Sequence, residues 1–65
     1  MDITRIEEIK NHYQLSVQMI DQILQNSSGE MTESDLNKLN SSYIVLSDTI
    51  SCLQELISMK SVEEN

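Results

Sequence analysis

His12 and Cys52 are the two side chains that could serve as a base and a nucleophile in this chain of 65 residues. An imidazole changes charge near neutral pH, and the thiolate is the reactive form of cysteine. Cationic neighbours or a helix N-terminus stabilise a thiolate, whereas Cys52 has acidic Asp48 and Glu55 within one helical turn. We therefore interpret His12 as a solvated helix residue and Cys52 as a small packing residue.

The acidic residues form pairs that lack the spacing of a metal site. Glu7-Glu8, Glu33-Asp35 and Glu63-Glu64 do not match the ligand spacing of a calcium-binding loop. One histidine and one cysteine cannot complete a zinc site, and a single cysteine forms no intrachain disulfide. The sequence therefore predicts that the protein is not an enzyme and has no metal, cofactor or small-molecule substrate.

The chain is acidic, with a formal net charge of -7 and four bases spread along it. Phosphate binding needs a cluster of Lys and Arg, so we expect no nucleic-acid partner, and the same charge disfavours an anionic membrane surface. No apolar run approaches the roughly 20 residues of a transmembrane helix. The first residues carry no basic stretch followed by an apolar one, so we expect no signal peptide and a cytoplasmic protein.

The second half of the chain carries a regular apolar pattern. Its apolar residues follow one another at alternating steps of three and four, which is typical of a helix that packs one seam against other helices. Thr32 is a candidate N-cap, and Met31 and Leu36 take the two positions of a hydrophobic staple. We expect a helix at about 33–60, with a seam formed by Leu36, Leu39, Tyr43, Leu46, Ile50, Leu53 and Ile57.

A helical pattern also spans about residues 3–25, where Asp2 can cap the start and residues 26–29 favour a chain reversal. A short connection makes the two helices antiparallel neighbours. The predicted fold is all-α: an antiparallel two-helix hairpin in one domain, residues 1–65, with a frayed tail at 61–65. In the first helix the predicted seam is formed by Ile6, Ile9, Tyr13, Ile20 and Ile23, with Ser16 as a polar member and Val17 and Leu24 beside it.

Both helices carry apolar residues away from this seam. On the second helix these residues lie roughly 100 to 150° around from it, at 100° per residue. Single exposed apolar residues are common, but one hairpin partner cannot cover two sides of a helix. A chain this short is also marginally stable alone and gains from association. We therefore expect a protein partner to dock on Val45, Cys52, Leu56 and Met59, joined by Leu15 and Met19.

Ile6-Glu7-Glu8 lies near the start of the first helix, and an apolar stretch runs from Ile44 to Ile57 in the second. With these features the chain resembles the small co-chaperones of type III secretion needle subunits, over most of its length. The resemblance implies a cytosolic hairpin that binds a helical partner and a needle subunit, and that keeps the subunit from polymerising early.

Leu46, Ser47 and Ile50 match three positions of a Leu-Ser-x-x-Leu-Asp pattern. In these residues the chain resembles the sporulation-regulating aspartyl-phosphate phosphatases, whose second helix carries that motif. The chain has Ser51 where that family has its acid, so phosphatase activity is not carried over. The plasmid-copy-control hairpin is similar in size, but its basic RNA-binding face has no counterpart here.

The sequence thus predicts a small protein-binding adaptor or co-chaperone that docks a helical partner through its second helix and completes a larger bundle. A partner of different sequence is the favoured hypothesis. Two alternatives stay open: a homodimeric four-helix bundle with the same residues inside, and a phosphatase-like regulator of a response regulator.

Overall fold

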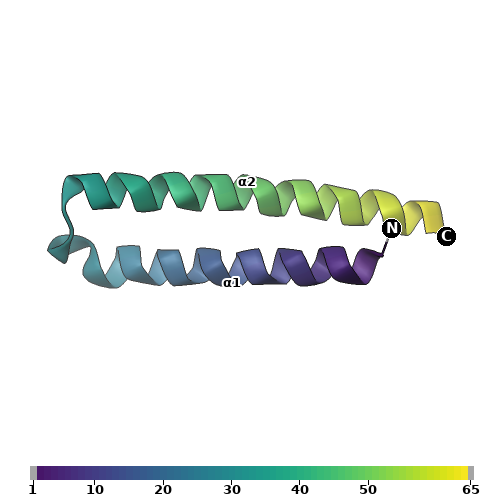
Figure 1. Cartoon of the computed structure of the whole chain (residues 1–65), viewed down its shortest axis with the longest axis horizontal. Helices are drawn as coiled ribbons and strands as arrows, with labels where there is room; N and C mark the ends of the chain where they lie inside the picture. The colour runs from purple at the N-terminus through teal and green to yellow at the C-terminus, as the bar shows by residue number, and fades with distance from the viewer. Residues whose placement is uncertain (1, 65) are drawn as a thin grey trace.

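The computed structural model describes residues 2–64, with side chains described for residues 2–62. Over this range the chain forms helix α1 (Ile3–Ser27), a 3-10 turn η1 (Ser28–Glu30) and helix α2 (Glu33–Glu64). α1 and α2 lie antiparallel and side by side in a rod 50 Å long and 14 Å across (Figure 1). The predicted all-α antiparallel hairpin is confirmed.

Each helix begins at a polar cap. Asp2 Oδ1 accepts a hydrogen bond from the backbone N–H of Thr4 (3.0 Å), and Thr32 Oγ1 accepts one from the backbone N–H of Asp35 (3.2 Å). These oxygens satisfy donors that the first turn of a helix leaves without intrahelical partners. Both predicted caps are therefore confirmed.

The chain reversal uses a short 3-10 turn and no left-handed residue. α1 continues to Ser27, past its predicted end, and the Met31 N–H donates to the Ser28 carbonyl oxygen (3.3 Å). No described residue has a positive φ, so this turn does not use the special freedom of Gly29. α2 also runs past its predicted end: residues 61–64 of the predicted frayed tail are helical, and Asn65 lies outside the described residues.

α2 packs on α1 through the seam that its sequence predicts. All the predicted positions of this seam, from Leu36 to Ile57, are half-buried. Thr49 and Leu56 are half-buried on one side of the seam, and Ser47 is half-buried on the other. The alternating three-four spacing therefore identified correctly which side of α2 faces its neighbour.

α1 is rotated about its axis relative to the prediction. Ile6, Tyr13 and Ile20 face α2 as expected, but Ile9 and Ile23 are 46% and 39% exposed, so their assignment to the seam is wrong. The apolar residues of α1 cover an arc wider than one seam, and two three-four series share the same three residues. The series that the packing selects adds Ile3, Lys10, Val17 and Leu24, all half-buried.

The two helices share a seam but enclose almost no core. Among the described side chains, Ile6 alone is buried, at 7% exposure, and none is below 2%. Two helices in a single layer cannot surround a side chain, because each seam residue keeps one side open to solvent. The functional question is therefore which residues lie on the two open sides of this layer.

Candidate protein-docking face

The hairpin has two broad faces, one on each side of the seam. On one face Lys10 Nζ donates a hydrogen bond across the helices to Gln54 Oε1 (2.7 Å), and Gln54 Nε2 donates to Ser58 Oγ (3.4 Å). The Lys10–Gln54 pair also shows which residues of the two helices are level with each other. Because the helices are antiparallel, a residue a given number of positions after Lys10 is level with the residue the same number of positions before Gln54. The same face has a groove lined by Gln14, Val17, Gln18, Ser47 and Ile50.

We call this side the polar face. The residues of the polar face follow one another along each helix at spacings of three, four or seven, which places them on the same side of that helix. Within it, Gln25 Nε2 donates to Asp21 Oδ2 (2.9 Å). Ile44 is its one large exposed hydrophobic side chain in the part of the chain that is described. The others are Glu7, Asn11, Gln14, Gln18, Asp21 and Gln25 on α1, and Asn37, Asn40, Ser47, Ser51, Gln54 and Ser58 on α2.

On the opposite side, α2 presents an apolar column. Val45, Cys52 and Met59 follow one another at steps of seven residues, which keeps them in line along a supercoiled helix, and all three are exposed. Thr49 and Leu56 fill the space between this column and the seam, and Thr49 Oγ1 donates to the Val45 carbonyl oxygen (2.9 Å). A shallow depression of about 400 Å³ between Val45, Leu46, Ser41 and Ser42 lies on the same side.

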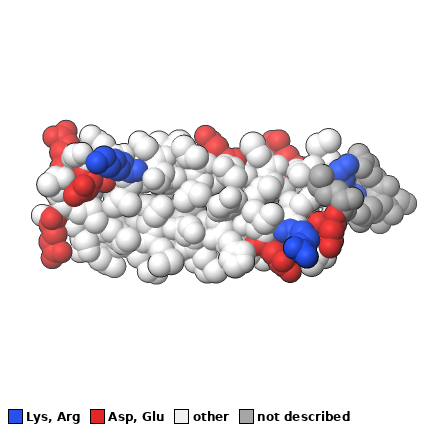
Figure 2. Space-filling view, in the orientation of Figure 1, with Lys and Arg blue, Asp and Glu red and all other residues white. Residues whose placement is uncertain are grey.

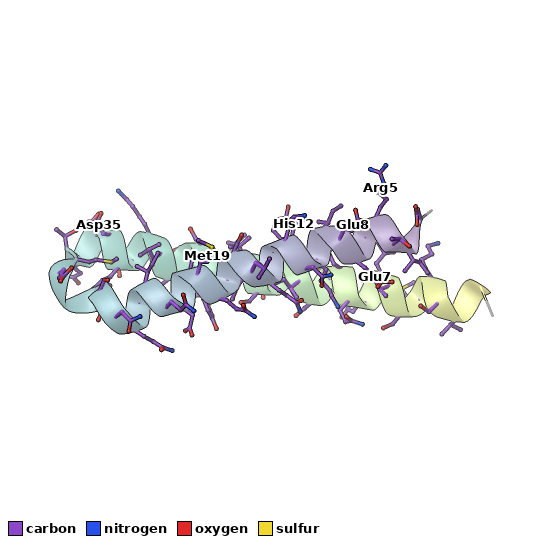
Figure 3. All side chains as sticks on the ribbon, turned by 90° about the horizontal axis from the view of Figure 1, so that it is seen from below. Arg5, Glu7, Glu8, His12, Met19 and Asp35 are labelled. Carbon is purple, nitrogen blue, oxygen red and sulfur yellow. The ribbon has the colours of Figure 1, made fainter. Side chains whose placement is uncertain are left out.

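α1 contributes two columns to this side. Ile9, Ser16 and Ile23, again spaced by seven, lie next to the seam, and the register brings Ile9 level with Leu56. Farther out lie Arg5, His12 and Met19. Figure 3 places these three on one side of α1, with Glu7 on the other. We call this side the apolar face, formed by Ile9, Met19 and Ile23 of α1 and by Val45, Cys52, Leu56 and Met59 of α2.

Charges are arranged around the apolar face and not across it. Figure 2 looks onto this side of the hairpin and shows its middle without charged side chains, which gather toward the ends and edges. Arg5 and Lys38 lie near its opposite ends. Of the described acidic side chains, Asp35 lies at one end of it, in the first turn of α2, and Asp2, the cap of α1 seven residues before Ile9, lies at the other end. The centre of the face is therefore suited to an apolar contact.

The predicted partner-binding residues fall into three groups. Val45, Met59 and Met19 are 62%, 60% and 64% exposed, and with exposed Cys52 they share the apolar face. Leu56 belongs to that face but is half-buried at the border of the seam, so the hairpin already covers part of it. Leu15 is exposed on the back of α1, opposite the seam, and does not join the others.

Two residues of the face were missed as docking residues. Ile9 and Ile23 were assigned to the seam, and the hairpin leaves them on the apolar face instead. A signal for them was present in the sequence: they stand seven residues on either side of Ser16, parallel to the column of Val45, Cys52 and Met59. Seven-residue spacing on both helices is what two neighbouring columns of one face require.

No arrangement for chemistry was found in the described part of the chain. His12 and Cys52 are both exposed, and the Ser16 hydroxyl donates to the His12 carbonyl oxygen (3.2 Å) and not to the ring. The described side chains, those of residues 2–62, include no group of three His, Cys, Asp or Glu placed to hold a metal ion. Ser51, where the phosphatase motif has its acid, lies on the polar face. No helix within this range is long and apolar enough to cross a membrane.

Comparisons with known proteins returned no similarity on which an argument could rest. No family model matches the chain, no curated protein matches it, and no solved structure matches its fold.

Proposed function

We propose that this chain works by binding protein, and that its apolar face docks the helices of a partner. The hairpin then forms part of a larger helical bundle. One observation carries the proposal: five of the eight large exposed hydrophobic side chains that are described gather on one face of a two-helix layer, while the other face is almost entirely polar. Fully covering a side chain such as Val or Met stabilises a complex by roughly 1.5–3 kcal/mol, so even partial cover of several such residues would supply the driving force.

The competing interpretation is that these are ordinary surface hydrophobics. Single exposed apolar residues are normal on soluble proteins. Random placement, however, would distribute them over both faces. Among the large exposed hydrophobic side chains that are described, the polar face holds Ile44 alone, and Leu15 and Val62 lie on the backs of the helices. The apolar face holds the other five: Ile9, Met19, Ile23, Val45 and Met59. A contiguous apolar area bordered by polar residues is the usual mark of an interaction surface.

The partner can be another protein or a second copy of the chain. In the first case the hairpin is an adaptor or co-chaperone, and protection of a polymerising helical subunit, as in the needle co-chaperones that the chain resembles, is one form of this role. Support for that form comes from the size of the chain, the acidic exterior and the hairpin architecture. In the second case the same face would lie inside a homodimer.

A pair of adjacent substitutions tests the proposal. Ile44 and Val45 are consecutive on α2 and similarly exposed, 58% and 62%, but they lie on opposite faces. We expect Val45→Asp to abolish binding of helical partners, because it buries an unpaired carboxylate, and Ile44→Asp to leave binding intact. Proteins that co-purify with the tagged chain from its source cells would be identified and then titrated against both variants by calorimetry. Equal binding by the two variants would contradict a docking role for the apolar face.

A further inference from the structure

We infer that the apolar face is closed by a second copy of this chain, which packs face to face with the first to form a four-helix bundle. The inference rests on the proposed function, because it names the occupant of the same docking face. Four observations support it: the near absence of a core in one hairpin, the area of the face, the spacing of its columns and the position of its charges.

A single hairpin lacks the burial that normally holds a small domain together. Ile6 is the one buried residue among the described side chains, and the lone cysteine cannot form an intrachain disulfide. Chains of this size without disulfides or metals usually depend on association. A second hairpin laid on the apolar face would cover the side of each seam that opens onto this face, and would turn half-buried residues there, such as Leu46 and Leu56, into core residues.

The area of the face fits a second copy. The hairpin is 50 Å long and 14 Å across, so one side projects onto a rectangle of about 700 Å², of the same order as the roughly 800 Å² of accessible surface that each partner buries in an interface of standard size. A second copy has the same length and width, and it therefore covers the whole face. A single partner helix would be narrower than the two-helix layer and would leave one outer column open.

The columns have the pattern of a helix with two neighbours. A helix in a four-helix bundle needs apolar residues on its first seam and on the adjoining column. The adjoining columns here are Ile9, Ser16 and Ile23 on α1, and Ser42, Thr49 and Leu56 on α2. Because Ile9 is level with Leu56, a face-to-face pair adds apolar layers at this end of the hairpin. Ser16 and Thr49 are level with each other near the middle and form a smaller, polar layer.

The charges permit this contact despite the net charge of -7 on each chain. The described acidic side chains on the face, Asp2 and Asp35, lie at its two ends, so no carboxylate lies in its middle. Two orientations satisfy the twofold symmetry of a face-to-face pair. In one, the copies run the same way, and Arg5 opposes the partner's Met59. In the other they run in opposite directions, and Arg5 opposes the partner's Asn26. Neither orientation sets Arg5 against Lys38, the other cation of the face, and Lys60, which is level with Arg5, lies seven residues after Leu53 in the seam.

The orientation also determines which residue opposes Cys52. If the copies run the same way, α1 lies against the partner's α2, and His12 is level with the partner's Cys52. If they run in opposite directions, α2 lies against the partner's α2, and Val45 is level with the partner's Cys52. A cysteine at position 12 or 45 therefore reports a second copy through the native thiol, because disulfides form only between Cα atoms within about 7 Å.

The first experiment measures the mass of the purified chain by sedimentation equilibrium over a wide concentration range. We expect a species of twice the chain mass of 7.5 kDa. Ile44→Asp should keep this dimer, and Val45→Asp should weaken it by about 100-fold or more, because each dimer would bury two unpaired carboxylates. A wild-type chain that stays monomeric at high concentration overturns the inference.

The second experiment does not depend on how Val45→Asp folds. Under mild oxidation, His12→Cys or Val45→Cys should give a disulfide-linked dimer with Cys52 on a non-reducing gel. The matched controls Asn11→Cys and Ile44→Cys, on the polar face, should give none. Crosslinks from the controls at the same rate overturn the inference. A monomer that binds another protein through Val45 would refute the second copy and keep the docking function, whereas a monomer without any Val45-dependent partner would refute both.

Discussion

The two faces of the hairpin differ most clearly where they are adjacent in sequence. On α2 the column Ile44, Ser51 and Ser58 belongs to the polar face, and the next residue in each case, Val45, Cys52 or Met59, belongs to the apolar face. One residue along a helix is a rotation of about 100°, which is enough to move a side chain from one side of a two-helix layer to the other. Whether a face is polar or apolar therefore depends on the residues spaced by seven along the helix, and not on the overall composition of the segment.

α1 shows the same contrast on either side of its seam. Glu7, Gln14 and Asp21 occupy the column on the polar side, while Ile9, Ser16 and Ile23 occupy the column on the apolar side. The polar columns make contacts inside the hairpin, as Lys10 and Gln54 do. The apolar columns have no such partner among the described residues beyond the seam itself. The comparison teaches that one face makes polar side-chain contacts within the hairpin, whereas the other leaves its apolar side chains exposed.

The largest expected effect comes from introducing an aspartate on each side of the seam of α2, at two positions that lie two residues apart. Leu56 is half-buried on the apolar side, so Leu56→Asp should lower the free energy of unfolding by roughly 2–4 kcal/mol and also abolish association. Gln54→Asp on the polar side should change stability by less than about 0.5 kcal/mol, because its carboxylate accepts from the Lys10 ammonium. Urea denaturation followed by circular dichroism measures the free energy of unfolding of both variants.

The outcome for Leu56→Asp separates two roles of that side chain. If the variant loses association and keeps its full helix content and stability, Leu56 acts in docking alone, and its partial burial against the hairpin has no energetic weight. If Gln54→Asp is as damaging as Leu56→Asp, the two sides of the seam are equivalent, and the contrast between the faces fails.

The fold was largely predictable because the apolar pattern of α2 is compatible with only one packing side. Its seam contains every step from Leu36 to Ile57 without a polar interruption, and its N-cap at Thr32 is a local signal. α1 was predicted less well. Its apolar residues extend from the seam onto the apolar face, so Ile9 and Ile23 fit the three-four pattern as well as Val17 and Leu24 do. Packing against α2, and not spacing, decided between them.

The polar face can be converted into a second apolar face. Ser51→Leu together with Ser58→Leu would extend Ile44 into a seven-spaced apolar column that mirrors Val45, Cys52 and Met59. We expect this double variant to associate beyond the state of the wild type, because the hairpin would then present docking columns on both sides. Sedimentation velocity would show larger species that grow with concentration. An unchanged size distribution would mean that a seven-spaced apolar column is not enough to make a docking face.

The residues exposed on the apolar face were predictable in part, for a related reason. Val45, Cys52, Met59 and Met19 are exposed on a common side, as the winding of the helices indicates. Leu15 does not join them, because its distance from the seam of α1 could be judged only once that seam was known. The position of Leu15 on the back of α1 therefore follows from the same rotation of α1 that exposes Ile9 and Ile23.

Apart from the control variants, the smallest predicted change in stability concerns Lys10, the basic residue in the seam of α1. Lys10 is half-buried between Ile6 and Tyr13, and its ammonium reaches the polar face to donate to Gln54. A polar side chain at a seam position costs stability but selects one register and one orientation. Lys10→Leu should therefore raise the free energy of unfolding by about 1 kcal/mol, as more apolar area is buried. Chemical denaturation of the variant checks this, with Gln54→Ala as a control that removes the acceptor and leaves the lysine. If Lys10→Leu instead destabilises the hairpin, the hydrogen bond contributes more than the added burial, and the polar face then takes a larger part in holding the helices together than its exposure indicates.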